Sequence, residues 1–219
     1  MTSNDMIYIK RLVEQKKLIG PVLELGAGYG GNTCREVIID AGLTYYASDM
    51  HSSPGVDYVA DFESDNVETF FTSAVKFKSI LILNVLEHTF NPVRILDSAK
   101  RLLDNDGSLV VIAPAVWTLH DYPIDCYRML PNWYEQYANS RKMILDRGCF
   151  EYLGYGVVDS FMDINGDYQF PLPAQGFAYW KSRVVHRLFN TFGRGMAFSS
   201  QLAIAAVISL NGTTDDANS

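Results

Sequence analysis

Cysteine, long apolar stretches and clustered metal ligands are all scarce in this sequence. Three of the 219 residues are cysteines, Cys34, Cys126 and Cys149, and they form neither a Cys-x-x-Cys pair nor an even set. This scarcity predicts reduced thiols in a cytoplasmic protein, without disulfides or a zinc site. The first 20 residues lack the apolar core of a signal peptide. The longest apolar run, residues 202–208, is too short to span a bilayer, so we expect no membrane span.

Positive charge is also in short supply. Lysine and arginine total 18 against 25 aspartates and glutamates, which gives a net charge of −7. Proteins that bind nucleic acid need a basic face to displace counterions from phosphates, so this balance argues against a nucleic-acid partner. No clustered metal-ligand spacing is present, and we expect no bound metal, although Asp121 and Asp125 could meet distant carboxylates in the fold.

What the sequence does contain is a regular alternation of helix-like and strand-like segments. With 48% hydrophobic and 20% charged residues, the composition is that of an ordinary globular protein, and the length fits one domain over residues 1–219. The alternation predicts an α/β fold with a doubly wound, mostly parallel, seven-stranded sheet. The expected strands are residues 22–25, 44–48, 57–60, 80–83, 109–112, 152–159 and 201–210. The expected helices are residues 7–18, 33–41, 67–75, 92–103, 131–147 and 178–192.

A glycine-rich stretch, residues 26–31, separates the first expected strand from the next helix. Glycines at such a bend let the backbone turn sharply and approach a ligand closely. The stretch satisfies two spacings. Gly26, Gly28 and Gly31 fit the pattern G-x-G-x-x-G of dinucleotide-binding loops, and Gly26, Gly28 and Gly30 fit G-x-G-x-G. The glycines alone therefore leave the ligand open.

Acidic residues near the ends of the strands separate these ligands. Asp49 ends the second strand, 21 positions after Gly28, where a carboxylate can accept hydrogen bonds from both ribose hydroxyls. Glu24, Asp61 and Glu87 also lie close to strand ends. An acidic rim repels a pyrophosphate and attracts a ligand with an amino group and a sulfonium. The charges therefore favour S-adenosylmethionine over NAD.

Several motifs together resemble class I S-adenosylmethionine-dependent methyltransferases. Residues 22–30 look like the first motif of that family, and the other motifs follow in its order and spacing. They are Asp49, residues 59–62, residues 84–88 and residues 106–111. The resemblance covers residues 5 to 115 and implies a Rossmann-like methyltransferase fold with S-adenosylmethionine as cofactor.

The resemblance also implies roles for individual residues. Gly26 and Gly28 would pass under the methionine moiety, and Asp49 would hold the ribose. Asp61 would reach the adenine amino group, and Asn84 would line the methionine end. Two residues would pack near the adenine ring, Met50 and Phe62, for which simple core positions are an equal alternative. The expected cofactor-binding residues are Glu24, Gly26, Ala27, Gly28, Asp49, Met50, Asp61, Phe62 and Asn84. Glu87 is part of the acidic rim, and the alternative for it is a residue that only caps or solvates a loop.

The acceptor would bind beside residues 115–135, which follow the fifth strand and emerge at the cofactor edge, and beside residues 160–182. Aromatic faces next to carboxylates and an arginine make a polar pocket with flat walls. The run from His120 to Arg128, with Pro131, resembles a segment of methyltransferases from sugar and glycan pathways. Alternatively, each aromatic ring packs under a helix, and residues 161–180 contact a second copy of the chain in a homodimer. The expected acceptor-binding residues are Trp117, Asp121, Tyr122, Asp125, Tyr127 and Arg128.

Transfer to a hydroxyl needs a group that removes its proton. His120 is the first candidate, because Asp121 and Asp125 lie near it in sequence, and His88 is the second, with a structural role in its loop as the alternative. We therefore expect an O-methyltransferase that acts on a small molecule or a sugar or glycan intermediate. Two alternatives stay open: an NAD(P)-dependent oxidoreductase, and a catalytically silent scaffold that binds S-adenosylmethionine.

Overall fold

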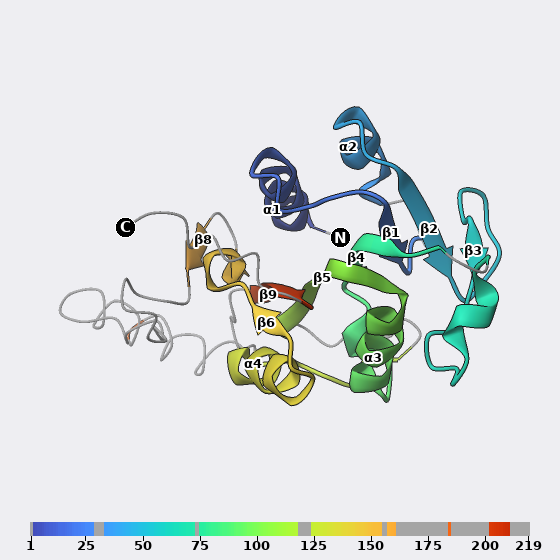
Figure 1. Cartoon of the computed structure of the whole chain (residues 1–219). Helices are drawn as coiled ribbons and strands as arrows, with labels where there is room; N and C mark the ends of the chain where they lie inside the picture. The colour runs from blue at the N-terminus through green and yellow to red at the C-terminus, as the bar shows by residue number, and fades with distance from the viewer. Residues whose placement is uncertain are drawn as a thin grey trace.

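A mixed β-sheet forms the centre of the structure, which is a computed structural model (Figure 1). It describes residues 2–28, 33–72, 75–117, 124–154, 157–160, 184 and 202–210. In these residues the sheet has nine strands, in the order β3-β2-β1-β4-β5-β9-β7-β8, with β6 paired to β9. The strands are β1 (Val22–Leu25), β2 (Tyr45–Asp49), β3 (Tyr58–Val59), β4 (Phe77–Leu83), β5 (Leu103–Val116), β6 (Ile144–Leu145), β7 (Glu151–Gly154), β8 (Val157–Ser160) and β9 (Leu202–Ser209).

Strands β1 to β5 are parallel to one another, and β9 runs antiparallel to β5, β6 and β7. β6 and β7 therefore run in the same direction as the first five strands. The predicted α/β class and mostly parallel sheet are confirmed.

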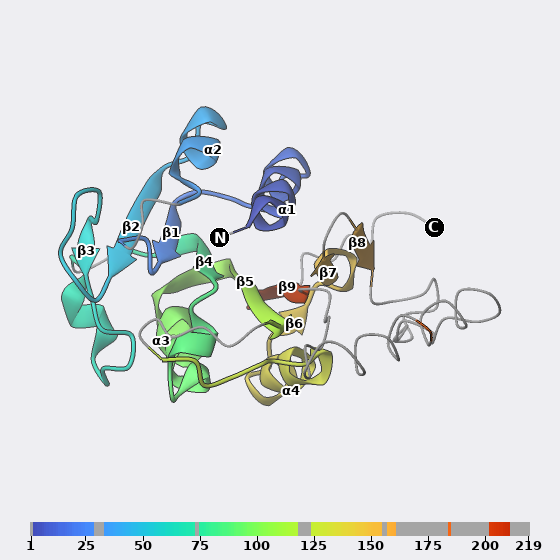
Figure 2. The same cartoon turned by 180° about the vertical axis from the view of Figure 1, so that it is seen from behind.

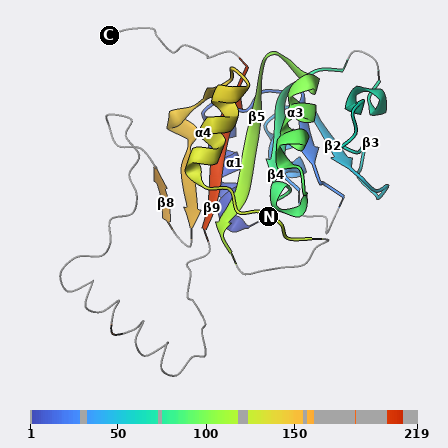
Figure 3. The same ribbon diagram turned by 90° about the horizontal axis from the view of Figure 1, so that it is seen from below.

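Helices cover both faces of the sheet. Figures 1 and 2, which view the molecule from opposite sides, both show α1 and α2 on one face and α3 and α4 on the other. In Figure 3, α3 and α4 lie in front of the strands and α1 lies behind them. The helices are α1 (Ser3–Glu14), α2 (Arg35–Asp40), α3 (Pro92–Leu102) and α4 (Pro131–Ser140), with 3₁₀ turns η1 (Val67–Phe70), η2 (Leu86–His88) and η3 (Arg147–Cys149).

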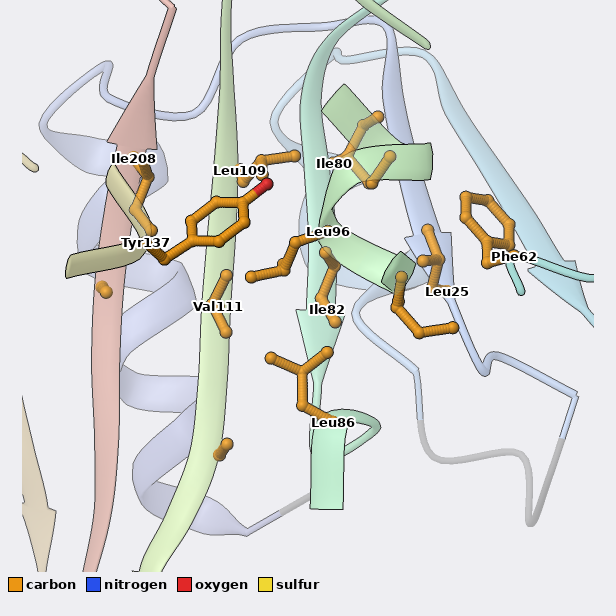
Figure 4. Packing of buried hydrophobic residues seen from close by; sticks show 14 of the residues in the cluster. Leu25, Phe62, Ile80, Ile82, Leu86, Leu96, Leu109, Val111, Tyr137 and Ile208 are labelled. Carbon is orange, nitrogen blue, oxygen red and sulfur yellow. The ribbon is translucent and has the colours of Figure 1, made fainter. Parts of the chain in front are cut away.

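The central strands are apolar throughout because both of their faces are buried. In β4, Ile80 and Ile82 join the cluster under α3 and α4, whereas Leu81 faces the cluster under α1 and α2. Figure 4 shows Leu96 of α3 and Tyr137 of α4 packed over this first cluster. This two-sided burial makes β4 and β5 the rigid base from which the functional loops extend.

Three predicted elements differ from the structure. The helix expected over residues 67–75 is only the 3₁₀ turn η1. The helix expected over residues 131–147 ends at Ser140, because Lys142 adopts a left-handed conformation (φ 53°) and residues 144–145 pair with β9. The strand expected over residues 152–159 is a hairpin of β7 and β8. The pairing of β6 and the division of residues 152–159 into β7 and β8 account for the two strands beyond the seven predicted. The predicted helix over residues 178–192 lies outside the described elements.

Strands β1, β2, β4 and β5 end at the same edge of the sheet because they are parallel. That edge therefore brings together residues 26–28, residues 49–53, residues 84–91 and the segment of residues 124–130, here called the acceptor segment. Ligands of doubly wound sheets bind at this carboxyl edge.

We predict that Ile82→Ala lowers the free energy of unfolding by about 3 kcal/mol, because the side chain is fully buried and its removal leaves a cavity. Chemical denaturation monitored by circular dichroism measures this loss. The matched control is Ile39→Ala in α2, whose side chain is 50% exposed and should cost less than about 1 kcal/mol. Equal losses for the two variants would contradict the described core.

Candidate functional site

Two glycines after β1 allow the chain to pass close to the ends of β2 and β4. Gly26 has φ +71°, and a Cβ atom there would lie 2.9 Å from Cγ2 of Val85. A Cβ at Gly28 would lie 2.8 Å from Oγ of Ser53 and 2.9 Å from Cγ of Asp49. Cβ atoms essentially never lie so close to other atoms, so a side chain at either position would have to displace these neighbours, and the positive φ of Gly26 adds backbone strain there.

The carboxylate of Asp49 is fixed beneath this loop. Its Oδ2 accepts a hydrogen bond from the backbone N–H of Gly28 at 3.1 Å, and its Oδ1 accepts one from the N–H of His51 at 2.9 Å. The side chain keeps 14% of its surface exposed. Each oxygen can accept further hydrogen bonds, so the carboxylate is held at the sheet edge and can still bind a hydroxyl group.

Glu24 is a buried carboxylate that accepts hydrogen bonds from the protein itself. Its Oε2 accepts one from the N–H of Cys34 at 2.9 Å and one from the hydroxyl of Tyr45 at 2.8 Å. Burial raises the pKa of Glu24, and both hydrogen bonds oppose that rise. Cys34 immediately precedes α2, so an internal carboxylate takes the N–H that a bound phosphate would use in a dinucleotide-binding loop.

The remaining expected cofactor residues have different surroundings. Met50 is 64% exposed and lies outside the core, as a contact with a ligand requires. Phe62 is 6% exposed and packs edge-on against Phe71, so it is part of the core, the alternative given for it above. Oδ1 of Asp61 accepts a hydrogen bond from the N–H of Glu63 at 2.8 Å. Ala27 is held to β2 by the bond from its N–H to the carbonyl oxygen of Ser48, at 3.1 Å.

Asn84 joins the end of β4 to the start of α1. It has a left-handed backbone (φ 54°), and its Nδ2 donates a hydrogen bond to Oδ2 of Asp5 at 3.0 Å. Asp5 is fully buried, and its other oxygen, Oδ1, has no hydrogen-bond partner among the described residues. The sequence analysis did not single out Asp5. Its only sequence signal is the capping pattern of Thr2 and Asp5, which marks a helix start.

On the acceptor side, an ion pair shapes the acceptor segment. The guanidinium of Arg128 contacts both oxygens of Asp125, with Nη2 at 2.6 Å from Oδ2. The Asp125 side chain is 3% exposed. The hydroxyl of Tyr127 donates to the carbonyl oxygen of Phe90 at 3.1 Å. Four residues of this predicted group are described: Asp125, Tyr127 and Arg128 lie in this segment, and Trp117 is the last residue of the preceding described range. His120, Asp121 and Tyr122 lie outside the described residues.

His88 and Glu87 lie between the end of β4 and the acceptor segment. Nδ1 of His88 is 2.6 Å from the carbonyl oxygen of Ile124, and its Nε2 is 3.7 Å from Oε1 of Glu87. Glu87 is 1% exposed, and its Oε2 has no hydrogen-bond partner among the described residues. Burial raises the pKa of Glu87 to about 7, and the positive charge of Arg128 opposes the rise. The alternative given for Glu87, a residue that only caps or solvates a loop, does not fit this buried carboxyl.

A groove of about 630 Å³ adjoins the acceptor segment. Its aromatic walls come from Phe90, Tyr127 and Trp133, and Arg94 and Arg101 supply charged groups. Arg94 is paired with Asp65 at 2.6 Å. The groove therefore offers flat apolar surfaces beside polar groups, next to the carboxyl edge.

The described parts of the chain contain no group of three or more histidine, cysteine, aspartate or glutamate residues placed to hold a metal ion. The described helices include none that is long and apolar enough to cross a membrane.

Comparisons with known proteins agree with this geometry. A family model described as a methyltransferase domain matches residues 7–193. No curated protein matches the sequence. The fold is similar to a SAM-dependent methyltransferase from Archaeoglobus fulgidus, with TM-score 0.54, 12% identity and 94% of each chain covered. It is also similar to the 1,6-didemethyltoxoflavin-N1-methyltransferase of Burkholderia thailandensis, with TM-score 0.58, 10% identity, and 95% of this chain and 79% of that chain covered. A third similar structure is the plantazolicin methyltransferase BamL, with TM-score 0.51, 13% identity, and 95% and 84% covered.

The buried carboxyl of Glu87 predicts a pH-dependent stability. Its pKa rises from 4.5 to about 7 on folding, so the folded state binds the proton more tightly and stability falls as pH rises through this window. One pKa unit corresponds to about 1.4 kcal/mol, so the loss between pH 5 and 8 is on the order of 2–3 kcal/mol.

We therefore expect Glu87→Gln to remove this slope and to be the more stable protein at pH 8. Denaturation at a series of pH values measures the difference. Glu14→Gln, at an exposed position of α1, is the control and should follow the wild type. Parallel curves for wild type and Glu87→Gln would contradict the prediction.

Proposed function

The chain belongs to the methyltransferase-domain family, and on this premise we propose that it transfers the methyl group of S-adenosylmethionine to a small-molecule acceptor. Two of the similar structures named above were solved with S-adenosylhomocysteine and a small-molecule ligand bound. The cytoplasmic location, the homodimer and a glycan acceptor stay predictions.

One observation carries the choice of cofactor: the chain's own carboxylates take backbone donors of the glycine loop. The N–H of Gly28 is bound to Asp49, and the N–H of Cys34 is bound to Glu24. A pyrophosphate would need such donors and would meet two carboxylates where they point. S-adenosylmethionine carries a sulfonium and an ammonium group, which these carboxylates attract. The site therefore favours S-adenosylmethionine over a nicotinamide dinucleotide.

The residues at the edge fit the parts of this cofactor. Asp49 has free acceptor capacity for the ribose hydroxyls, and Gly26 and Gly28 leave room for the methionine moiety. Met50, exposed at the end of β2, would contact the adenine, and Asp61 would accept its amino group. Asn84 would line the methionine end, and the buried Asp5 beside it would add negative charge near the cofactor's ammonium group. When bound, the cofactor supplies an activated methyl carbon.

The residues of the chain then have to align the acceptor with the methyl group and to remove the proton of the acceptor hydroxyl. Alignment of two reactants is worth up to about 7–11 kcal/mol. The acceptor segment and the groove beside it offer aromatic faces, an ion pair and polar atoms, which suit a small acceptor with hydroxyl groups. We propose a hydroxyl of a small molecule, such as a sugar or glycan intermediate, as the methylated group, with His120 as the base. Both proposals rest on the sequence.

We predict that wild-type protein binds S-adenosylhomocysteine in isothermal titration calorimetry and does not bind NAD⁺. Asp49→Ala should weaken this binding at least about tenfold, because it removes the ribose acceptor and releases the N–H of Gly28. The matched control is Asp106→Ala, which changes an exposed aspartate beside Lys78. The affinity of this variant for S-adenosylhomocysteine should stay at the wild-type level.

Gly28→Ala tests the same region from the other side of the contact. Its new Cβ must displace Asp49 or Ser53, so affinity should fall while the fold persists. Stabilisation of the wild type by NAD⁺, or an Asp49→Ala variant that binds S-adenosylhomocysteine normally, would overturn the cofactor assignment.

The acceptor type is tested by the product. We expect incubation with S-adenosylmethionine and a panel of small hydroxylated compounds, sugar nucleotides included, to yield an O-methylated product by mass spectrometry. His120→Ala should slow its formation by about 10²-fold or more, as loss of a general base does. An N- or C-methylated product would contradict the hydroxyl proposal, and cofactor binding with no product from any acceptor would favour the silent scaffold.

A further inference from the structure

Short hydrogen bonds tie the acceptor segment to the loop that follows β4. The N–H of Cys126 donates to the carbonyl oxygen of Glu87 at 2.7 Å, and Nδ1 of His88 lies 2.6 Å from the carbonyl oxygen of Ile124. A third bond joins Tyr127 to the same loop. No α-helix or β-strand spans residues 124–130, so the position of the acceptor segment depends on these hydrogen bonds.

The imidazole of His88 has a defined pattern of protons. A carbonyl oxygen can only accept, so Nδ1 must carry the hydrogen that is donated to Ile124. The other nitrogen, Nε2, faces Oε1 of Glu87 at 3.7 Å, an ion-pair distance. A carboxylate there favours a second proton on the ring. A doubly protonated ring also makes the bond to Ile124 charge-assisted, and such bonds are stronger than neutral ones.

The surroundings of Glu87 maintain this arrangement. From the acceptor segment, the guanidinium of Arg128 attracts the carboxylate and Asp125 repels it, with Arg128 the larger effect. From α4, the buried hydroxyl of Tyr134 also lies within electrostatic range of Glu87. Burial of the Glu87 carboxylate lowers the stability of the fold, so a role other than stabilising the fold is the better explanation for it.

We propose that Glu87 and His88 are positioning residues, which hold the acceptor segment in place through a chain from carboxylate to imidazole to backbone carbonyl. The assignment of this segment to the acceptor rests on the proposed function. Both nitrogens of His88 are engaged in this chain, which favours positioning over proton abstraction for this residue.

This role and a purely structural role predict different results for Glu87→Gln. The glutamine amide has nearly the same shape as the glutamate carboxylate but carries no charge, so its attraction to the imidazole of His88 is lost. Overall stability at pH 8 should then rise, while the acceptor segment should loosen. A buried glutamate that only fills space would give a segment that stays the same or tightens.

The experiment is hydrogen–deuterium exchange of the Cys126 amide, together with the rate of tryptic cleavage after Arg128, in the full chain. At pH 8, Glu87→Gln should raise both rates about tenfold, the scale expected from the loss of one charge-assisted bond.

His88→Asn provides the second variant, because an asparagine amide can donate from the position of Nδ1. It should loosen the segment less than His88→Ala does. Glu135→Gln in α4, which alters a peripheral ion pair with Arg147, is the control and should leave both rates unchanged.

Unchanged or slower exchange in Glu87→Gln, or an equal change in Glu135→Gln, would overturn the proposal. Calorimetry of wild type with S-adenosylhomocysteine separates this outcome from the proposed function, because the exchange rates are measured without the cofactor. If wild type fails to bind, the cofactor assignment falls, and the exchange rates still decide the role of Glu87.

Discussion

The functional edge of this sheet depends on carboxylates that accept hydrogen bonds from the backbone of the glycine loop and of the turn into α2. Asp49 holds Gly28, and Glu24 holds Cys34. Bonds of this kind are charge-assisted and contribute about 1.5–3 kcal/mol each. They fix the loop against the ends of β1 and β2, and they leave carboxylates at this edge. In the proposed function, this one arrangement both shapes the site and favours a cationic ligand.

The fold could be predicted where local sequence decides the outcome. Strands such as residues 80–83 and 109–112 were predicted because a short apolar run buried on both faces is visible in the sequence. The helix ending at Ser140 was predicted too long, because its end is set by pairing of residues 144–145 with β9, more than 60 positions away. Such pairing leaves no local pattern.

The same distinction holds for the site. Gly28 and Asp49 could be found from sequence because strand ends and a spacing of 21 place them at one edge. Asp5 and Glu87 could not, because their surroundings depend on distant residues: Asp5 meets Asn84, 79 positions on, and Glu87 interacts electrostatically with Arg128 and Tyr134. A carboxylate is expected to be solvated unless the chain that covers it is known.

The two halves of the site are consequently built in different ways. The cofactor half consists of strand ends whose carboxylates and backbone groups bind one another, so a change there disturbs the sheet itself. Three hydrogen bonds attach the acceptor segment to the loop after β4: the carbonyl of Ile124 accepts one, and the N–H of Cys126 and the hydroxyl of Tyr127 each donate one. The charges around Glu87 add to this attachment. Two of these hydrogen bonds use backbone groups of the segment and one uses the Tyr127 hydroxyl, so only the side chains that take no part in these bonds or in the ion pair can change without loss of the segment's position. In the proposed function, a fixed cofactor site lies beside an adaptable acceptor surface, and residues 124–130 and the adjoining groove would set the identity of the acceptor.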